Sequence, residues 1–235
     1  MFGRSAIKCS TFFLGEVPFH NAWRMQQAIM HERLAGQDRR EVLLICQHPL
    51  VYTAGRRTPT VPNNPSFDVI RVERGGQLTC HCPGQLVVYP LFDLHLYKMD
   101  LRWYISTLES CVINVLDRFG IKGSRHHRYP GVWVGANKLA SVGISCSKWL
   151  TMHGLSVNIA PDLSHFDAIT PCGISSDEGL GVTSIEHLIS QKTPKIDEVT
   201  THIINEFQEL FNIDCVNDSN SPVLSEQSRP RTIPF

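Results

Sequence analysis

The feature that most constrains the fold is a central run of short segments that lies between strongly amphipathic helical patterns. Segments 131–134, 138–147 and 151–159 are rich in β-branched residues and broken by small ones, which is typical of strands. Apolar residues fall on one face of 101–119 and of 196–211, which predicts two helices. Helices and strands mix without strict alternation, so the sequence predicts an α+β fold with a mixed β-sheet.

The rest of the chain supports one domain with a loose end. The other predicted elements are a helix and three strands, at 19–35, 41–46, 67–72 and 85–92. Residues 47–66 contain four Pro, two Asn and a Gly, and are predicted to form a loop. We expect a single domain over residues 1–214, because 235 residues is a common size for one large domain. Residues 215–235 have little to bury and are predicted to be disordered.

Charge and hydropathy exclude several classes of partner. Lys and Arg number 22 and Asp and Glu number 22, so the net charge of zero argues against a nucleic-acid partner. No apolar run approaches the roughly 18 residues of a membrane-spanning helix, so no membrane partner is expected.

Cysteine content and the first residues bear on location. The eight Cys are about 3% of the chain, far below the roughly 8–10% of a disulfide scaffold, which favours a reducing compartment. No acidic residue precedes Glu16, and no apolar core is present there. This start excludes a secretory signal and permits a very short mitochondrial presequence.

A glycine-rich segment at 74–85 carries many polar side chains. Gly75 and Gly76 allow positive φ and a close approach of a ligand to the backbone. Arg74, Thr79, His81 and Gln85 are candidate hydrogen-bond donors beside them. A plain hairpin connection with a structural arginine would look similar, but the density of polar groups beside glycines favours a binding loop.

Two cysteine motifs have different interpretations. In Cys80-His81-Cys82 the side chains are adjacent in sequence and cannot all turn toward one metal ion, so no metal site is predicted. Cys172 lies between Pro171 and Gly173, in an irregular segment with an accessible backbone. Although a lone cysteine is usually inert, this setting makes Cys172 a candidate nucleophile.

Four ordered sequence blocks resemble the lipoyl(octanoyl) transferase family. The blocks are RGGQLTCHCPGQLVVYP at 74–90, GVWVGANKLASVGI at 131–144, MHGLSVNI at 152–159, and TPCG at 170–173 followed by GVTS at 181–184. They occur in the family's order and spacing, and weaker similarity extends over about residues 12–211. Four ordered blocks are far more specific than any one of them.

The resemblance implies a role for each matching residue. Cys172 matches the family's acyl-thioester nucleophile, and Lys138 matches the lysine that lowers the pKa of that cysteine and transfers protons. The residues that match substrate-binding positions are Arg74, Gly75, Gly76, Gln77, Leu78, Thr79, Cys80, His81, Ser141, Val142, Gly143, Gly154, Leu155 and Ser156. This chain departs from the family at Cys82, where glycine is commonest, and at Cys80, where an aromatic residue is frequent. A side chain at position 82 has the potential to narrow the loop beside His81.

The resemblance also implies a reaction, partners and a fold. The family transfers octanoyl from octanoyl-acyl carrier protein to a lysine of lipoyl domains, the first step of endogenous protein lipoylation. The acceptors are the lipoyl domains of 2-oxoacid dehydrogenase E2 subunits and the glycine cleavage H protein. The fold is shared with biotin and lipoate ligases. The chemistry is thioester exchange, so no cofactor and no metal is expected. A eukaryotic member is expected in the mitochondrial matrix and a bacterial one in the cytoplasm.

A Cys–Lys pair makes physical sense if the lysine does more than supply charge. A cysteine with a pKa of about 8.5 is roughly 3% thiolate at pH 7. Lowering that pKa to about 6.5 raises the thiolate fraction roughly 25-fold, while nucleophilicity falls roughly 8-fold at a Brønsted slope near 0.45. The net gain is only about threefold, so we expect Lys138 to act mainly by positioning and proton transfer.

Two alternatives stay open from the sequence. An ATP-dependent lipoate or octanoate ligase of the same fold would typically show a triple-glycine loop and need no nucleophilic cysteine, whereas this chain has only Gly75-Gly76 and carries Cys172. A non-catalytic binding protein for lipoyl domains is disfavoured because both Lys138 and Cys172 are present.

Overall fold

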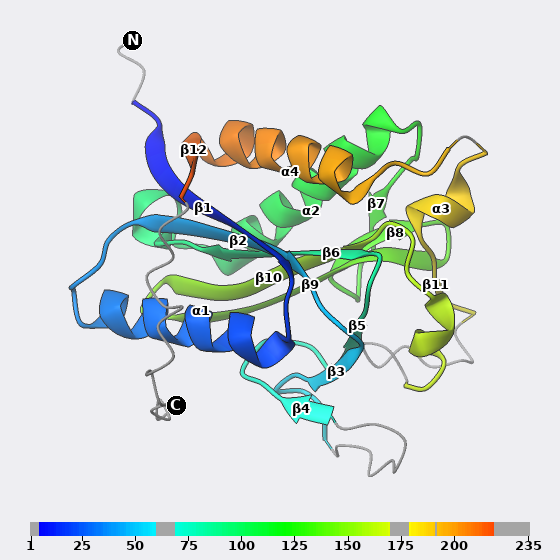
Figure 1. Cartoon of the computed structure of the whole chain (residues 1–235), viewed down its shortest axis with the longest axis horizontal. Coiled ribbons are helices and arrows are strands. Elements are labelled where there is room, and N and C mark those ends of the chain that lie inside the picture. The colour runs from blue at the N-terminus through cyan, green and yellow to red at the C-terminus, as the bar shows by residue number, and fades with distance from the viewer. Residues whose placement is uncertain (1–4, 60–68, 170–178, 191, 219–235) are drawn as a thin grey trace.

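The central element of the protein is a large mixed sheet with helices on both faces. The computed structural model describes residues 5–59, 69–169, 179–190 and 192–218. Helix α1 (Phe19–Leu34) covers one face of the sheet, and helices α2 (Leu101–Arg118) and α4 (Ile196–Phe211) cover the other (Figure 1). The predicted α+β class, with a mixed sheet flanked by helices, is confirmed.

The large sheet combines parallel and antiparallel pairs. Within the described residues its order is β12 (Ile213–Asn217), β1 (Ile7–Glu16), β2 (Glu41–Gln47), β6 (Gln85–Leu91), β10 (Leu150–Asn158), β9 (Asn137–Ser147), β8 (Gly131–Val134) and β7 (Ser124–Arg125), with β11 (Gly181–Val182) paired to β9. Strand β1 is parallel to β2 and β12, and β11 is parallel to β9. The other neighbours are antiparallel.

A second, smaller sheet and three short helices complete the described elements. The smaller sheet has the order β4 (Val69–Arg71), β3 (Val51–Ala54) and β5 (Leu78–His81). The short helices are the 3-10 helices η1 (Leu94–Leu96) and η2 (Leu163–Phe166) and the α-helix α3 (Ile185–Leu188). The small sheet lies below the first turn of α1 in Figure 1, at one end of the large sheet.

The central strands are continuously apolar because both of their faces are covered. In β2, Leu43 and Ile45 pack into the core formed with α2 and α4. Their neighbours Val42, Leu44 and Cys46 pack against α1. Side chains alternate between the two faces of a strand, so a strand with helices on both sides needs apolar residues at every position.

The helix boundaries follow from local capping. Helix α2 begins after Asp100, whose carboxylate accepts hydrogen bonds from the backbone N–H groups of Arg102 and Trp103. Helix α4 ends at Asn212, which adopts a left-handed conformation with φ of 50°. The three long helices predicted from apolar periodicity agree with the structure to within one residue at each end.

Three sequence expectations need correction. Strand β1 was not predicted, and β3 lies inside the segment predicted to be a loop. The expectation of disorder from residue 215 is wrong for residues 215–217, which belong to β12. In β12, Cys215 pairs with Cys9 of β1. A weakly apolar segment therefore gains its order from a strand partner at the other end of the chain. Residues 219–235 lie outside the described residues.

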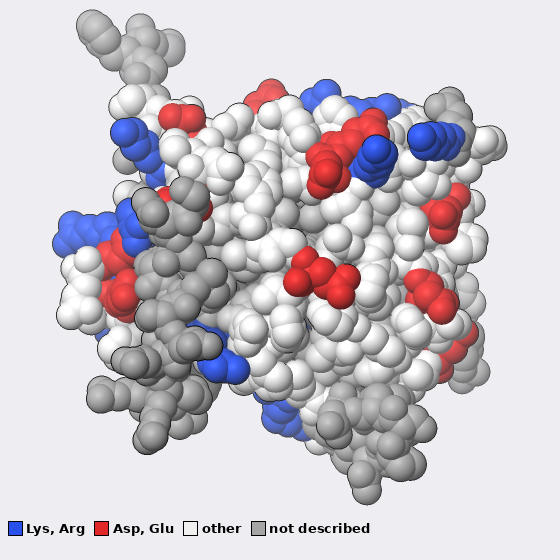
Figure 2. Space-filling view, viewed as in Figure 1, with Lys and Arg blue, Asp and Glu red and all other residues white. Residues whose placement is uncertain are grey.

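The surface mixes both signs of charge. Blue and red side chains are interspersed on the face seen in Figure 2, and neither sign forms a continuous stretch there. This distribution agrees with the equal numbers of acidic and basic residues. Among the described helices, none has the length and apolar character needed to cross a membrane.

Candidate active site

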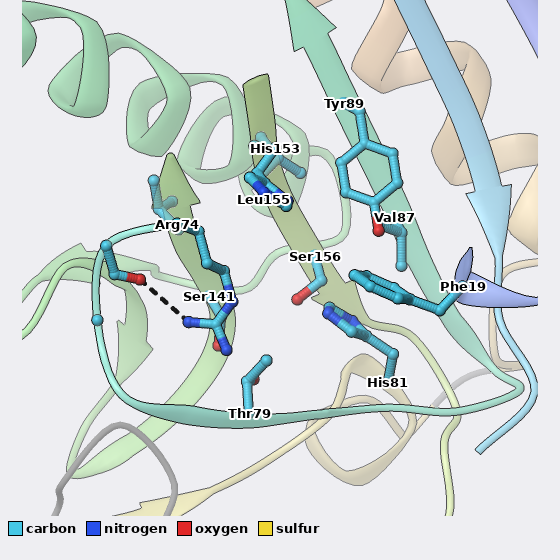
Figure 3. Close-up of a pocket in the computed structure, with 15 residues that line it drawn as sticks. Phe19, Arg74, Thr79, His81, Val87, Tyr89, Ser141, His153, Leu155 and Ser156 are labelled. Atoms are coloured by element: carbon cyan, nitrogen blue, oxygen red, sulfur yellow. Dashed lines mark hydrogen bonds between the residues drawn. The ribbon is translucent and has the colours of Figure 1, made fainter. Parts of the chain in front are cut away.

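A pocket that is partly open to solvent lies between the α1 face of the large sheet, the start of α1 and the loop before β5. Eleven of the fourteen predicted substrate-binding residues line it (Figure 3). They are Arg74, Gly75, Gly76, Thr79 and His81 from the loop and β5, Ser141, Val142 and Gly143 from β9, and Gly154, Leu155 and Ser156 from β10. Three sequence blocks thus meet at one cavity.

Gln77, Leu78 and Cys80 do not line the pocket, and strand alternation explains this for Leu78 and Cys80. Thr79 and His81 point to the pocket from β5. Leu78 and Cys80, at the intervening positions, are buried in a small apolar cluster on the other face. Gln77 contributes its carbonyl, which accepts a hydrogen bond from the N–H of Gly55 at 3.1 Å.

Cys82, the departure from the family pattern, joins the same apolar cluster as Cys80. Its side chain is 1% exposed. It does not belong to the pocket lining. The cysteine therefore leaves the pocket beside His81 unobstructed.

The glycine loop is fixed to both sheets. The N–H of Gly75 donates to the carbonyl of Ile144 on β9 at 2.8 Å, and Gly76 has a φ of 83° that favours glycine. The Arg74 guanidinium donates to the Thr53 carbonyl at 2.9 Å, to the Thr53 hydroxyl at 2.8 Å and to the Gly75 carbonyl at 3.0 Å, the last dashed in Figure 3. Arg74 is thus built into the wall of the pocket.

Two glycines on neighbouring strands of the large sheet line the pocket. Gly143 of β9 pairs with Gly154 of β10. A Cβ atom at position 154 would overlap the Val88 carbonyl oxygen of β6, so the close approach of β6 requires glycine there. A Cβ atom at position 143 would lie 3.2 Å from the Arg74 side chain. The two glycines leave room for the loop and for a ligand.

Three buried histidines lie at the pocket or beside it, and burial lowers the pKa of each. Burial lowers the pKa of His81 to about 3, and the nearby ring of His48 lowers it further. Burial also lowers the pKa values of His48 and His153. The ring of His81 stacks on Phe19 with centroids 6.2 Å apart, and His48 bonds the Tyr89 hydroxyl at 2.8 Å.

A buried carboxylate, Glu73, contacts the pocket residue His153. Glu73 accepts from the indole N–H of Trp23 at 3.1 Å and lies 3.2 Å from Nε2 of His153. Burial alone would raise the pKa of Glu73, but the interaction with His153 and the hydrogen bond from Trp23 outweigh it and the pKa is lowered. His153 has a φ of 59° within β10, and its N–H donates to the Gln26 side chain on α1 at 2.8 Å. The strained backbone at His153 is held by these contacts.

Lys138 is buried rather than solvated. It lies on β9, three residues before Ser141, and is 3% exposed. Its Nζ is 5.0 Å from the ring centre of Trp133, and within the described residues no carboxylate forms an ion pair with it. Lys138 is not among the residues that line the pocket.

Cys172 belongs to residues 170–178, which lie outside the described residues. The described residues on either side of that segment contact β5 and β9. Ile169 packs in the apolar cluster with Leu78 and Cys80. Val182 pairs with Lys138 in the β11–β9 ladder.

Four pocket residues were not predicted as site residues: Phe19, Val87, Tyr89 and His153. The first three appear in the sequence as ordinary apolar positions of a helix and a strand, with nothing to distinguish them. His153 falls inside the block at 152–159, but a single histidine in a strand carries no spacing signal. Among the described residues, no group of three or more His, Cys, Asp or Glu forms a candidate metal site.

Comparison with known proteins identifies the family. The lipoyl protein ligase A/B catalytic domain matches residues 18–208. An octanoyltransferase from Nostoc sp. is 37% identical over 89% of this chain and 95% of its own length. The protein belongs to the octanoyltransferase family. It is therefore an enzyme, an acyltransferase.

Eukaryotic members of the octanoyltransferase family are equally similar. A chloroplastic octanoyltransferase of Arabidopsis thaliana is 40% identical over 88% of this chain and 80% of its own length. The mitochondrial octanoyl-acyl-carrier-protein:protein N-octanoyltransferase of Danio rerio is 40% identical over 85% of this chain and 90% of its own length.

Solved structures support the same fold at low sequence identity. A lipoate-protein ligase A bound with ATP has a TM-score of 0.71 at 18% identity, covering 90% of this chain and 89% of that one. A biotin protein ligase from Aquifex aeolicus has a TM-score of 0.52 at 13% identity, covering 88% of this chain and 70% of that one. The octanoyltransferase thus has the expected ligase-like catalytic fold.

Proposed function

We propose that this octanoyltransferase moves an octanoyl group from octanoyl-acyl carrier protein to a specific lysine of lipoyl domains, through a thioester on Cys172. The acceptors are the lipoyl domains of 2-oxoacid dehydrogenase E2 subunits and the glycine cleavage H protein. The observation that carries the proposal is that three family blocks meet at one pocket. One strand of that pocket, β9, also bears the buried Lys138.

The first half-reaction forms the acyl-enzyme. The Cys172 thiolate attacks the thioester carbonyl of the donor, and the C–S bond to the carrier breaks. The carrier leaves as a thiolate and takes up a proton, while octanoyl remains as a thioester on Cys172. Backbone N–H groups near Cys172 or in the glycine loop hold the oxyanion that forms on the carbonyl oxygen.

The second half-reaction forms the amide. The lipoyl-domain lysine is an ammonium in water and must lose a proton before it can attack. Lys138 takes that proton, the amine nitrogen forms the new C–N bond and releases its second proton to solvent, and the C–S bond to Cys172 breaks. Cys172 returns to its thiolate, so the net reaction exchanges one thioester for one amide and needs neither ATP nor a metal.

The pocket supplies the binding energy for the acyl chain. Its large apolar lining residues are Phe19, Val87, Tyr89 and Leu155. Phe19, Val87 and Tyr89 lie on one side, Ser141 lies on the opposite side, and Ser156 lies between them (Figure 3). Burial of seven chain carbons at about 0.8 kcal/mol each supplies at most about 5–6 kcal/mol. The hydrogen-bonded pair of His48 and Tyr89 stiffens this wall.

We place the enzyme in a reducing compartment, since an oxidised Cys172 cannot carry an acyl group. In a eukaryotic cell this compartment is the mitochondrial matrix, as the names of organellar relatives suggest. In a bacterium it is the cytoplasm.

A transfer assay tests the proposed function. Purified enzyme, octanoyl-acyl carrier protein and an apo lipoyl domain are mixed with and without ATP, and the lipoyl domain is weighed by mass spectrometry. We expect octanoylation without ATP, its loss in Cys172→Ala, and its retention in the matched control Cys146→Ala. Cys146 is half-buried and lies on β9 outside the pocket lining. Strict ATP dependence, or full activity of Cys172→Ala, would overturn the proposal in favour of a ligase.

A further inference from the structure

A continuous chain of buried hydrogen bonds joins the pocket to the strand beside Lys138. The Asn158 amide nitrogen donates to the Thr183 carbonyl at 3.0 Å. The Gln85 amide nitrogen donates to the Asn158 amide oxygen at 2.8 Å. The Gln85 amide oxygen lies 2.6 Å from Nδ1 of His81. All four residues are at most 7% exposed, so the chain is shielded from water.

The Thr183 carbonyl, at one end of this series of hydrogen bonds, sets the donor and the acceptor of every bond in it. A backbone carbonyl only accepts, so Asn158 must present its nitrogen to Thr183 and its oxygen to Gln85. Gln85 must then present its nitrogen to Asn158, which turns its oxygen toward His81. An amide oxygen only accepts, so Nδ1 of His81 must carry the proton. The neutral ring of His81 therefore has a lone pair at Nε2.

The Nε2 atom is the one left for a ligand. In the described part of the chain, Nδ1 is the only ring nitrogen of His81 with a hydrogen-bonding partner, and the ring lines the pocket beside Phe19 and Ser156 (Figure 3). The ring faces His48, His153 and Arg74, none of which is an anion that would favour a protonated ring. A neutral imidazole of this tautomer accepts a hydrogen bond from a substrate N–H and cannot donate one.

The same chain also holds the backbone beside Lys138. The Thr183 N–H donates to the Lys138 carbonyl at 3.0 Å, while the Thr183 carbonyl accepts from Asn158. Residue 183 is therefore fixed on both sides. The Asn158 side chain hydrogen-bonds to both Gln85 and Thr183, so it couples the pocket face of β5 to the strand that bears Lys138.

We propose that Gln85 and Asn158 are positioning residues for octanoyl transfer: they fix His81 as a hydrogen-bond acceptor for an N–H group of the substrate and hold β11 against Lys138. The substrate N–H groups of this reaction are the incoming lysine amine and the amides of the carrier's acyl arm. The inference rests on the proposed function, because it assigns His81 and Lys138 to that reaction.

The first test removes the link. Asn158→Ala is expected to lower kcat/KM about 10- to 100-fold, because a small misplacement of reacting groups has an effect of that size. The matched control is Asn114→Ala. It removes a part-buried hydrogen bond of 2.8 Å that the Asn114 amide of α2 donates to the Glu206 carboxylate of α4. Both variants are compared at equal folded fraction, measured by near-UV circular dichroism. A loss of activity in Asn158→Ala no greater than in Asn114→Ala would overturn the inference.

The second test uses the pH dependence of activity to ask whether Nε2 of His81 acts as a hydrogen-bond acceptor. Gln85→Glu keeps an oxygen for Nδ1 but places a carboxylate beside His81, which raises the pKa of the ring. As pH falls from 8.5 to 5.5, the ring of this variant becomes an imidazolium and Nε2 becomes a donor. At high pH we expect a partial loss of activity, because the carboxylate cannot donate to the Asn158 oxygen. At low pH we expect a further loss of about tenfold. A pH profile parallel to that of the wild type would contradict the acceptor role.

Nitrogen NMR separates failure of the inference from failure of the proposed function. Ring nitrogen shifts of His81, assigned by comparison with His81→Gln, report the tautomer without any substrate. We expect a protonated Nδ1 and a bare Nε2 at pH 7, and a mixture of tautomers in Gln85→Ala. If the wild type shows this tautomer but transfers no octanoyl group, the proposed function fails. If it transfers octanoyl but shows a proton on Nε2, the positioning role fails.

Discussion

The two faces of the central sheet differ sharply in what they bury. On the α2 and α4 face, the core consists of apolar side chains such as Leu108 and Phe207, both completely buried. On the α1 face, Gln26, His48 and His153 are buried to a similar degree, and each is 2% exposed or less. The same strands supply both faces.

The difference teaches how one sheet serves stability and chemistry together. Side chains alternate along each strand, so β6 sends Val88 to the apolar core and Val87 and Tyr89 to the pocket side. Buried polar groups are costly unless they are hydrogen-bonded, which explains the dense bonding around Glu73 and His81. We expect substitutions on the two faces to have separable effects.

The largest effect is expected from Lys138→Ala. Loss of the proposed proton-transfer group should lower kcat about 100- to 10,000-fold while leaving the fold intact. The matched control is Lys122→Ala, which removes a lysine that is exposed at 86%. Steady-state transfer rates and thermal melting are measured for both. Near-normal kcat in Lys138→Ala would remove Lys138 from the mechanism.

A substitution in the apolar core should do the opposite. Leu108→Ala is expected to lower the free energy of unfolding by about 2–5 kcal/mol, because it leaves a cavity in a completely buried region. Transfer activity per folded molecule should stay within about threefold of wild type. Urea unfolding followed by an assay at low temperature checks both quantities. If Leu108→Ala lost activity but kept the stability of the wild type, the two faces of the sheet would not have separate roles.

Much of the fold was predictable because its signals are local. The helices at 101–118 and 196–211 show clear apolar periodicity, and β2 is a clean apolar run. Strands β1 and β12 were missed because each is partly polar, and the strand that pairs with β12 is about two hundred residues away. Composition reports what a segment can bury and says nothing of a distant strand that will pair with it.

The site residues that match the family's sequence blocks could be predicted. The residues that reach the pocket only through packing in the folded structure could not. Arg74, Ser141 and Gly154 were expected, and the structure brings them together. Tyr89 and His153 were not expected, because their roles come from packing across strands. Leu78 and Cys80 were expected at the site, but strand alternation turns them into the apolar cluster.

The buried histidines predict a steep loss of stability in acid. The folded pKa values of His48, His81 and His153 are lowered, to about 3 for His81, whereas the unfolded values lie near 6.5. As pH falls below about 6.5, the unfolded chain takes up protons that the folded chain does not. Each such proton lowers the free energy of unfolding by about 1.4 kcal/mol per pH unit.

Urea unfolding between pH 7.5 and pH 5 checks this slope. His48→Gln keeps a donor for Val17 and an acceptor for Tyr89, and should make the slope shallower by up to about 1.4 kcal/mol per pH unit. The control His127→Gln changes an exposed histidine and should leave the slope unchanged. An unchanged slope in His48→Gln would show that His48 titrates normally in the folded enzyme.

The smallest effect contrasts adjacent residues on opposite faces. Val87→Leu adds a methylene to the pocket wall and should shift preference from octanoyl toward hexanoyl donors, by about 1–3 kcal/mol at most. Val88→Leu adds the same methylene to the opposite core and should reduce stability alone. Competition between the two acyl donors measures the preference. Equal preference shifts in both variants would contradict the assignment of faces.

The most direct test of the central claim is the intact mass of the enzyme after incubation with octanoyl-acyl carrier protein and no acceptor. The account predicts a single octanoyl adduct that maps to Cys172, disappears in Cys172→Ala and is discharged when an apo lipoyl domain is added. An adduct that persists in Cys172→Ala, or rapid transfer with no adduct at any time, would contradict it.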